Sequence, residues 1–253
     1  MPSMTVLDMV QKILSSMDSD EVNSINDTLE ATQIAEVIET TYYNIITGRD
    51  WPHLFRLFKL DASGTTARPT HMKLPENYQE MTWLKYNKRK TTDTKDKFED
   101  VTYKTPLEFM ELVNVRDESE TNIDLIVDNV SSINLKIQTD KAPTYWTSFD
   151  NAYVIFDSYD SIVETTLTSN RTQCYGKIEP TFTISDGFIP DLPTSMFSYL
   201  LNEAKAVAFV EVKQTQNPKA EQNSLTQRRR MSQGAWRLAG GIKFASFGRK
   251  GKK

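Results

Sequence analysis

The sequence predicts an α+β protein in which N- and C-terminal helices pack as one bundle, with a central β-rich domain, sandwich or barrel-like, and an extended C-terminal tail. Apolar residues recur at helical spacing near both ends of the chain. The middle consists of short runs rich in Thr, Val, Ile, Tyr and Phe between Gly, Pro, Asn and Asp. The predicted segments are residues 1–50 (helical hairpin), 51–190 (β-rich domain), 191–237 (C-terminal helices) and 238–253 (basic tail).

The first predicted helix covers residues 5–17. Its apolar positions step by 3, 1, 3, 1 and 3 and therefore share one helical stripe; they are Val6, Met9, Val10, Ile13, Leu14 and Met17. A second helix follows, with Ser24 or Asn26 as its N-cap and Gly48 as the residue that ends it. The two helices form an antiparallel hairpin whose outer surface is acidic, because residues 1–50 carry nine acids and two bases.

The middle of the chain predicts β structure interrupted by a short helix from Pro106 to Val113, where proline suits the first turn. Alternating apolar residues are clearest near Leu125 to Ile137. The expected strands are residues 54–60, 80–86, 123–127, 132–138, 152–156, 162–168 and 180–184.

Helical spacing returns after Pro193, and this helix is expected to run to Gln214, before Asn217-Pro218 stops it. A more polar helix is expected from about Lys219 to Trp236, because Ala, Glu, Gln, Leu and Arg dominate there. No independent fold is expected beyond Gly240.

Composition points to an unsecreted protein without a membrane span. The chain has 253 residues, of which 38% are apolar, enough for a sizeable core. No stretch approaches the roughly 20 apolar residues that cross a bilayer, and the N-terminus lacks the pattern of a signal peptide. The single Cys174 cannot form an intramolecular disulfide and is expected to be a buried apolar residue, as in proteins made in a reducing cytoplasm.

The sequence predicts no enzyme, no cofactor and no metal site. His53 and His71 are the only histidines and, with the lone cysteine, have no ligand spacing. Phosphate-binding glycine loops and nucleophile motifs do not occur. Asp117, Glu118 and Glu120 lie close together but in a polar, solvated run. A hydrolase whose acids are dispersed along the chain remains an open third interpretation, which reproducible turnover lost on a single carboxylate change would revive.

Charge is distributed unevenly along the chain. Residues 228–253 hold nine Lys or Arg and no acid, which leaves 21 basic and 34 acidic side chains, a net charge of −13, in the first 227 residues. Such a segment cannot form a core alone, but its aromatic residues and cations can dock on an acidic partner. Its candidate contact residues are Arg228, Arg229, Arg230, Trp236, Arg237, Lys243, Phe244, Phe247, Arg249 and Lys250.

Four segments resemble one family, the head-to-tail adaptor proteins of short-tailed bacteriophages, also called tail tubular protein A. GRDWPHLF (48–55) is similar to the entry into that family's β region, and LPENYQEMTWLKY (74–86) to its Leu-Pro-x-x-Tyr segment. APTYWTSFDNAYVIFDSYDS (142–161) resembles a strand pair common in phage virion proteins. IPDLPTSMFSYLLNEAKAVAFVEVKQTQNPKAEQ (189–222) resembles the family's C-terminal helix. The order of the motifs matches across most of the chain, whereas residues 86–140 have no counterpart in compact members.

The resemblance implies a virion structural protein at the head-tail junction, made in the host bacterial cytoplasm. Family members form a homo-oligomeric, dodecameric ring that connects the portal to the tail and encloses the channel for DNA ejection. The implied partners are the portal protein, the distal tail (nozzle) protein and neighbouring adaptor subunits. No membrane partner is implied.

Three interpretations of the basic segment stay open: docking on the portal, nonspecific contact with DNA, and a solvated tail without a partner. The alternative function is accordingly a sequence-nonspecific DNA-binding protein that uses this segment. Glu30, Glu36, Glu39 and Trp51 are expected at the subunit interface. The acids would meet Arg228–Arg230 of a neighbour or repel DNA from the channel wall; charge reversal would disrupt assembly only in the first case.

Overall fold

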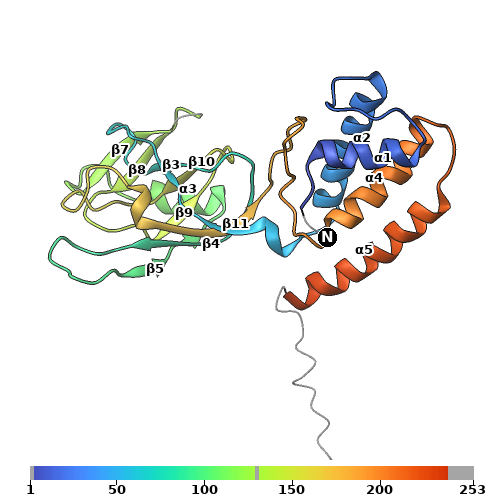
Figure 1. The fold of residues 1–253 in the computed structure, drawn as a ribbon. Coiled ribbons are helices and arrows are strands. Elements are labelled where there is room, and N and C mark those ends of the chain that lie inside the picture. The colour runs from blue at the N-terminus through green and yellow to red at the C-terminus, as the bar shows by residue number, and fades with distance from the viewer. Residues whose placement is uncertain (1–2, 129–130, 239–253) are drawn as a thin grey trace, which may run out of the picture. The chain divides into compact units, whose positions relative to one another are not determined.

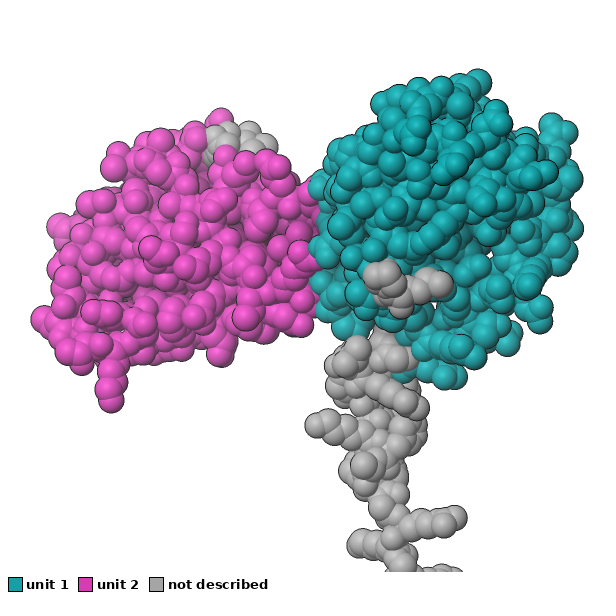
Figure 2. Space-filling view, viewed as in Figure 1, with its two compact units in different colours: residues 1–54, 180–253 teal, residues 55–179 magenta. Residues whose placement is uncertain are grey.

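A computed structural model describes residues 3–128 and 131–238 (Figure 1). The described chain divides into two compact units: residues 55–179, and the two ends of the chain, residues 1–54 and 180–253 (Figure 2). Four of the described helices lie in the unit built from the chain ends, and all described strands lie in the other. The protein therefore belongs to the α+β class. The unit from the chain ends is called the helical unit below, and residues 55–179 the β unit.

The helical unit contains α1 (Val6–Ser16), α2 (Leu29–Thr47), a 3-10 turn η1 (Pro52–Leu54), α4 (Phe197–Glu211) and α5 (Pro218–Leu238). The first helix begins where the sequence predicts, because Thr5 and Asp8 cap it reciprocally. The Asp8 N–H donates to Thr5 Oγ1 at 3.1 Å, and the Thr5 N–H donates to Asp8 Oδ2 at 3.0 Å.

The second helix starts later than the sequence prediction placed it. Its N-cap is Thr28, whose Oγ1 accepts the Ala31 N–H at 3.1 Å. Ser24 lies instead in a turn that Asp27 organises, since the Asn23 and Ser24 N–H groups both donate to Asp27 Oδ2 at 2.8 Å. Four closely spaced polar residues that can all cap a helix made the first turn ambiguous.

Gly48 ends α2 for a steric reason. Its φ of −66° is helical, so no left-handed conformation requires glycine there. A Cβ at Gly48 would lie 2.8 Å from the Asn44 carbonyl oxygen, closer than real Cβ atoms come to an oxygen. The glycine therefore permits the close approach of the chain as it leaves the helix.

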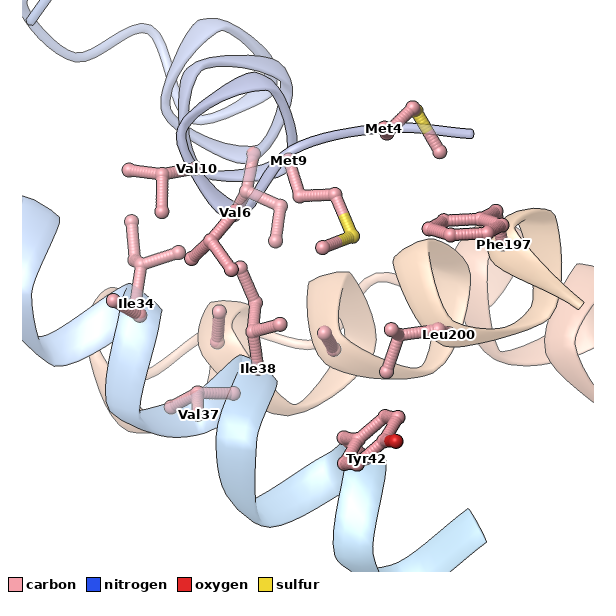
Figure 3. Close-up of a cluster of buried hydrophobic side chains, with 14 of the residues drawn as sticks. Met4, Val6, Met9, Val10, Ile34, Val37, Ile38, Tyr42, Phe197 and Leu200 are labelled. Carbon is pink, nitrogen blue, oxygen red and sulfur yellow. The ribbon is translucent and has the colours of Figure 1, made fainter. Parts of the chain in front are cut away.

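One apolar cluster joins α1, α2 and α4 (Figure 3). Val6 and Met9 of α1, Ile38 of α2 and Leu200 of α4 are all fully buried in it. Met231 of α5 packs against the same cluster but is only partly buried. The two ends of the chain thus share one core, which positions α4 and α5 beside the first two helices.

Asn217-Pro218, which was predicted to end one helix, also begins the next one, α5. Helix α4 ends at Glu211, three residues before the predicted Gln214. The chain turns away here because Gln214 has a left-handed φ of 53°, and the Thr215 N–H donates to the Phe209 oxygen at 3.1 Å. Asn217 then caps α5: its Oδ1 accepts the Ala220 N–H at 3.1 Å, and proline occupies the first helical position.

In the β unit, one sheet has the strand order β1-β11-β4-β5 and another the order β2-β3-β10-β9-β6, while β7 and β8 form a separate hairpin. Helix α3 (Pro106–Asn114) begins with a Thr105–Glu108 capping box, as the proline predicted. The strands are β1 (Phe55–Phe58), β2 (Asp61–Ala62), β3 (His71–Lys73), β4 (Tyr78–Asn87), β5 (Phe98–Asp100), β6 (Thr102–Tyr103), β7 (Ile123–Val127), β8 (Asn134–Gln138), β9 (Tyr145–Thr147), β10 (Tyr153–Phe156) and β11 (Thr172–Ile178), with a 3-10 turn η2 (Ser169–Arg171).

The sequence did not predict β2, β3, β5, β6, β9 or β11. The longest of these is β11, which lies between β1 and β4. Its inward positions carry Thr172, Cys174 and Gly176 rather than large aliphatic residues, so its period-2 pattern is weak. Gly176 is required by the close approach of β4, since a Cβ there would lie 2.1 Å from the Glu80 carbonyl oxygen. The same closeness explains the irregular register that follows Tyr175.

The predicted strand at residues 162–168 is wrong. Asp160 turns the chain there: its backbone oxygen accepts the N–H groups of Val163 and Glu164, both at 3.0 Å, and its Oδ1 accepts that of Ile162 at 3.1 Å. Ile162 is 86% exposed. Within residues 162–168 only Leu167 is buried, so the run lacks the alternating buried positions of a strand.

The predicted strand at residues 180–184 is also wrong, because this segment packs against helices. The Phe182 ring lies 5.1 Å from that of Tyr42, and the Phe182 N–H donates to the Tyr43 hydroxyl oxygen at 3.0 Å. Further along, the Val6 N–H donates to the Phe188 oxygen at 2.9 Å. The aromatic residues that favoured a strand prediction here hold an extended segment against α1 and α2.

Candidate functional site

Several polar contacts join helix α5 to α4. Gln227 Nε2 donates to the Ser198 hydroxyl oxygen at 2.6 Å, and Gln227 Oε1 accepts from Asn202 Nδ2 at 3.2 Å. Ser224 donates to the Glu203 carboxylate. Ala220 and Ser224 are the buried positions among the residues of α5 whose side chains are described. Most of this helix therefore faces away from the core and is open to a partner.

The three arginines of the predicted basic segment that the structure describes, Arg228, Arg229 and Arg230, are all exposed on α5. Arg228 borders a cleft of about 300 Å³ between α2, α4 and α5, together with Arg49 and Glu203. Burial, and then the nearby Glu203 carboxylate, raise the pKa of Tyr199 in the same cleft, whereas Arg228 acts in the opposite direction. The cleft is thus lined by two cations, Arg49 and Arg228, and one acid, Glu203.

The other predicted contact residues cannot be placed. Trp236 and Arg237 belong to α5, but their side chains lie outside the described structure. Lys243, Phe244, Phe247, Arg249 and Lys250 lie outside the described residues altogether. Their role stays a prediction from the sequence.

The acids predicted at the subunit interface differ in their surroundings. Glu30 is engaged within the chain: its Oε1 accepts the Ser19 hydroxyl at 2.9 Å and lies 3.4 Å from Lys213 Nζ. Glu36 is exposed and Glu39 half-buried on α2. Glu36 also borders a shallow surface hollow with Glu211 of α4. Glu36 and Glu211 are thus both exposed acids on this surface.

Trp51, also predicted at the subunit interface, is largely enclosed by its own subunit. It is 4% exposed, and its indole Nε1 donates to the Ile45 carbonyl oxygen at 2.7 Å. The Arg49 guanidinium lies 5.6 Å from the ring centre, within range of a cation–π contact. Trp51 therefore fixes the exit from α2 and leaves little surface for another subunit.

Two titratable groups of the β unit, Cys174 and Asp117, have pKa values that their surroundings shift. Cys174 is buried, and burial raises the pKa of its thiol to about 12, so the thiolate needed for nucleophilic attack does not form near neutral pH. Asp117 accepts bonds from the backbone and hydroxyl of Ser119, which lower the pKa of its carboxyl group. Glu118 and Glu120 beside it are exposed. Among residues 3–128 and 131–238, no three His, Cys, Asp or Glu side chains converge to hold a metal ion.

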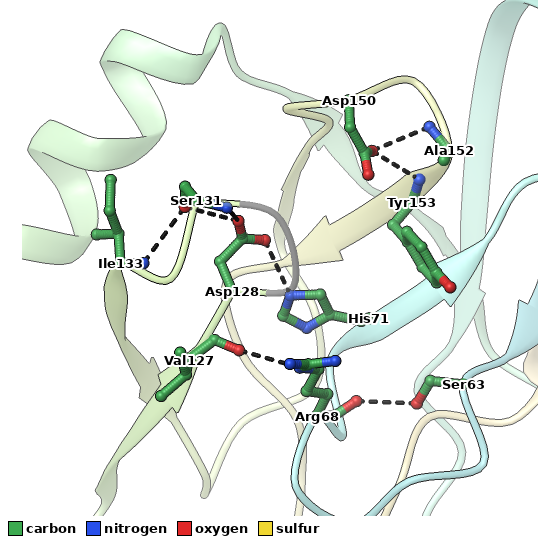
Figure 4. Close-up of polar contacts among 10 residues, drawn as sticks. All are labelled: Ser63, Arg68, His71, Val127, Asp128, Ser131, Ile133, Asp150, Ala152 and Tyr153. Atoms are coloured by element: carbon green, nitrogen blue, oxygen red, sulfur yellow. Dashed lines mark hydrogen bonds and ion pairs between the residues drawn. The ribbon is translucent and has the colours of Figure 1, made fainter.

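A buried histidine–aspartate pair connects β3 to the end of β7 (Figure 4). His71 Nε2 and Asp128 Oδ1 lie 3.4 Å apart, and the two side chains are 1% and 3% exposed. Burial lowers the pKa of His71, although the bond to Asp128 opposes the shift. The Ser131 hydroxyl donates to Asp128 at 2.6 Å rather than to the histidine, so the three side chains are not connected as a nucleophilic triad.

Sequence reasoning missed a second buried ionic site. Arg116 follows α3, and its Nη2 lies 3.1 Å from Asp157 Oδ2. The other carboxylate oxygen, Asp157 Oδ1, accepts the N–H groups of Thr144 at 2.9 Å and Tyr145 at 2.8 Å. These bonds connect α3 to the strand pair β9–β10, which lies in the APTYWTSF motif region and does pair antiparallel. No local pattern could reveal a contact between residues 41 positions apart.

No protein-family model and no curated protein matches the chain. Among the described helices, none is both long and apolar enough to cross a membrane. The candidate site is the exposed basic surface of α5, defined here by Arg228, Arg229 and Arg230.

Proposed function

We propose that the protein is a head-to-tail adaptor of a short-tailed bacteriophage, a virion structural component without a catalytic role. Its subunits form a ring at the head-tail junction, connecting the portal to the tail and enclosing the channel for DNA. In this proposal α1, α2, α4 and α5 act as one helical bundle, and the β unit is a sandwich-like domain that meets the distal tail (nozzle) protein.

The observation that carries the proposal is the exposed basic surface of α5. A helix that contributes few buried side chains to its own unit has a large surface left for a partner, and Arg228–Arg230 give that surface a charge opposite to the acidic body of the chain. The resemblance of four motifs to the adaptor family supports the same function. The portal is the proposed partner of residues 228–253.

Neighbouring adaptor subunits are the second proposed partner. Glu36 and Glu211, exposed on α2 and α4, would meet cations of the adjacent subunit. Glu30 contributes less in this arrangement because Ser19 and Lys213 already occupy its carboxylate. Reversing the charge of Glu36 should weaken ring assembly, whereas the same change at exposed Glu118 of the β unit serves as the matched control.

The proposal is tested by native mass spectrometry of the full-length chain and of a version ending at Gln227, each mixed with the portal ring from the same genome. The full-length chain should add to the portal in ring stoichiometry, and the shortened chain should not. If neither chain binds, the adaptor function is wrong.

A second candidate function, nonspecific DNA binding, is favoured by the nine cations and the lack of acids in residues 228–253. Counterion release would then make affinity fall steeply as salt rises. Fluorescence anisotropy of labelled duplex DNA at several salt concentrations measures this slope. A steep slope that is lost in the chain ending at Gln227 would favour DNA binding, and weak binding that persists without the segment would exclude this use of it.

A further inference from the structure

Between β5 and β6 the chain passes from one sheet of the β unit to the other. Residues 98–100 pair with β4, and the Val101 N–H still donates to the Leu84 oxygen at 2.9 Å. The next residues leave β4 and pair with β9 instead: the Thr102 N–H bonds to the Thr144 oxygen at 3.0 Å, and the Lys104 N–H to the Trp146 oxygen at 2.9 Å. The chain therefore opens a wedge between the two sheets at Val101.

This wedge contains a groove of about 440 Å³. One wall is the first half of β4, from Tyr78 to Leu84, and the other includes Tyr103 of β6 and Trp146 of β9. The Tyr103 and Trp146 rings lie 4.8 Å apart, and Tyr103 is 50% exposed. Two neighbouring aromatic rings thus border the groove opposite β4.

Both walls of the groove present strand edges. Beyond the residues that pair with β5, no described strand covers Gln79–Trp83 on the side away from β11. On the opposite wall, the N–H groups of Thr102 and Lys104 point to β9, so that of Tyr103 points away from β9. Open edges of this kind pair with extended peptide segments, and natural proteins normally cover them.

The groove also has a defined charge. Its lining contains two carboxylates, Glu80 and Asp100, and no Lys or Arg among the described lining residues. Asp100 lies 3.5 Å from Lys85 Nζ, but its side chain is 75% exposed. The groove accordingly favours a segment that is extended, partly aromatic and basic.

We propose that the groove binds residues Ile242–Phe247 of a neighbouring copy of this chain as an added strand. This segment reads IKFASF; it combines strand-forming Ile and Phe residues with Lys243 and has no acid. Gly241 and Gly248 flank it, and fifteen residues follow the last described one. Exchange of a segment from each subunit to the next is a head-to-tail contact, the kind that closes into rings.

This inference deepens the proposed adaptor function, on which it rests, by naming the contact that joins adjacent subunits. It narrows the portal contact proposed above for residues 228–253 to the arginines of α5, because residues 242–247 would hold the adjacent subunit instead.

Disulfide cross-linking between two variants of the full-length chain tests the proposal. One variant carries Thr82→Cys in the groove, and the other carries Ser246→Cys in the segment; the native Cys174 is buried and does not interfere. After mild oxidation of the mixture, a non-reducing gel should show a dimer that contains both variants. A mixture of Ser119→Cys, an exposed loop position, with Ser246→Cys should give at least tenfold less dimer.

Two further measurements complete the test. Adding Glu80→Lys to the Thr82→Cys variant should lower the dimer yield several-fold, because it reverses a charge at the groove wall. Equal yields from the Thr82 and Ser119 mixtures would overturn the proposal. So would a double variant that cross-links within single chains at a rate independent of concentration, since the segment would then occupy its own groove. The experiment needs no portal, so failure of portal binding alone would reject the adaptor function and leave this contact standing.

Discussion

Buried polar side chains are divided unevenly between the two units. In the helical unit only Thr41 and Ser224 belong to this group among the described residues. The β unit buries eight: Thr70, His71, Asn87, Asp128, Thr147, Asp157, Ser158 and Thr172. Helices satisfy their own backbone groups and meet through apolar stripes, whereas short strands and long connections need side chains to hold them together. The helical unit should therefore respond most to lost volume, and the β unit to lost bonds and charge.

The largest effect is expected from breaking the buried ion pair of the β unit. Arg116→Met should destabilise that unit by about 3–5 kcal/mol, because it leaves the buried Asp157 carboxylate without its charged partner. Hydrogen-exchange mass spectrometry, which reports each unit separately, should show faster exchange in residues 55–179 only. Arg228→Met, at an exposed arginine, is the control and should change neither unit. Unchanged protection in the Arg116 variant would contradict the comparison.

A similar or slightly smaller effect is expected from a cavity in the helical unit. Leu200 is fully buried among α1, α2 and α4, so Leu200→Ala should cost about 2–4 kcal/mol. Exchange should then accelerate in the helices and not in the strands. Leu225→Ala, at a leucine that is 56% exposed on α5, should stay within about 0.5 kcal/mol of the parent. Equal losses at both leucines would mean that α5 is more buried than described.

Mild acid should distinguish the two units. Burial holds the pKa of His71 below its ordinary value of 6.5, so the folded β unit binds fewer protons than the unfolded chain. Its stability is complete above about pH 6.5 and falls as the pH drops toward the lowered pKa. Urea unfolding followed by hydrogen exchange at several pH values measures the slope, which His71→Gln should flatten. A slope that persists in this variant would assign the pH dependence to other groups.

The smallest effect is expected from one bond at the exit of α2. Trp51→Phe keeps an aromatic ring but removes the donor to the Ile45 oxygen, which should cost about 1 kcal/mol. Thermal unfolding of the full-length chain measures it. A loss as large as that of Leu200→Ala would mean that packing of the indole, rather than its hydrogen bond, dominates.

The helices were predictable because each carries local signals. The stripe of α1 and the proline that opens α3 depend on residues a few positions apart, and both predicted elements are present. Five predicted strands are present, namely β1, β4, β7, β8 and β10. The predicted alternation is confirmed in β8, where Leu135 and Ile137 are buried, but β7 buries Ile126 and exposes Leu125 and Val127. Strand β11 was not predicted because its inward residues are small. Residues 180–184 were wrongly predicted as a strand because their aromatic side chains pack on helices from another part of the chain.

The candidate sites divide in the same way. The charge of residues 228–253 is a property of composition and needs no structure. The sequence could not predict three features that depend on residues far apart in the chain. They are the burial of Trp51, the contacts of Glu30 and the wedge at Val101. Long-range contacts decide which exposed residues remain free for partners.

The most direct test of the adaptor function is a cryo-electron microscopy reconstruction of the neck of the virion whose genome encodes this chain. The proposed function predicts a ring of this protein between the portal and the tail, with α5 against the portal and the β units toward the tail. A virion that lacks the protein, or that carries it away from the head-tail junction, would contradict the account.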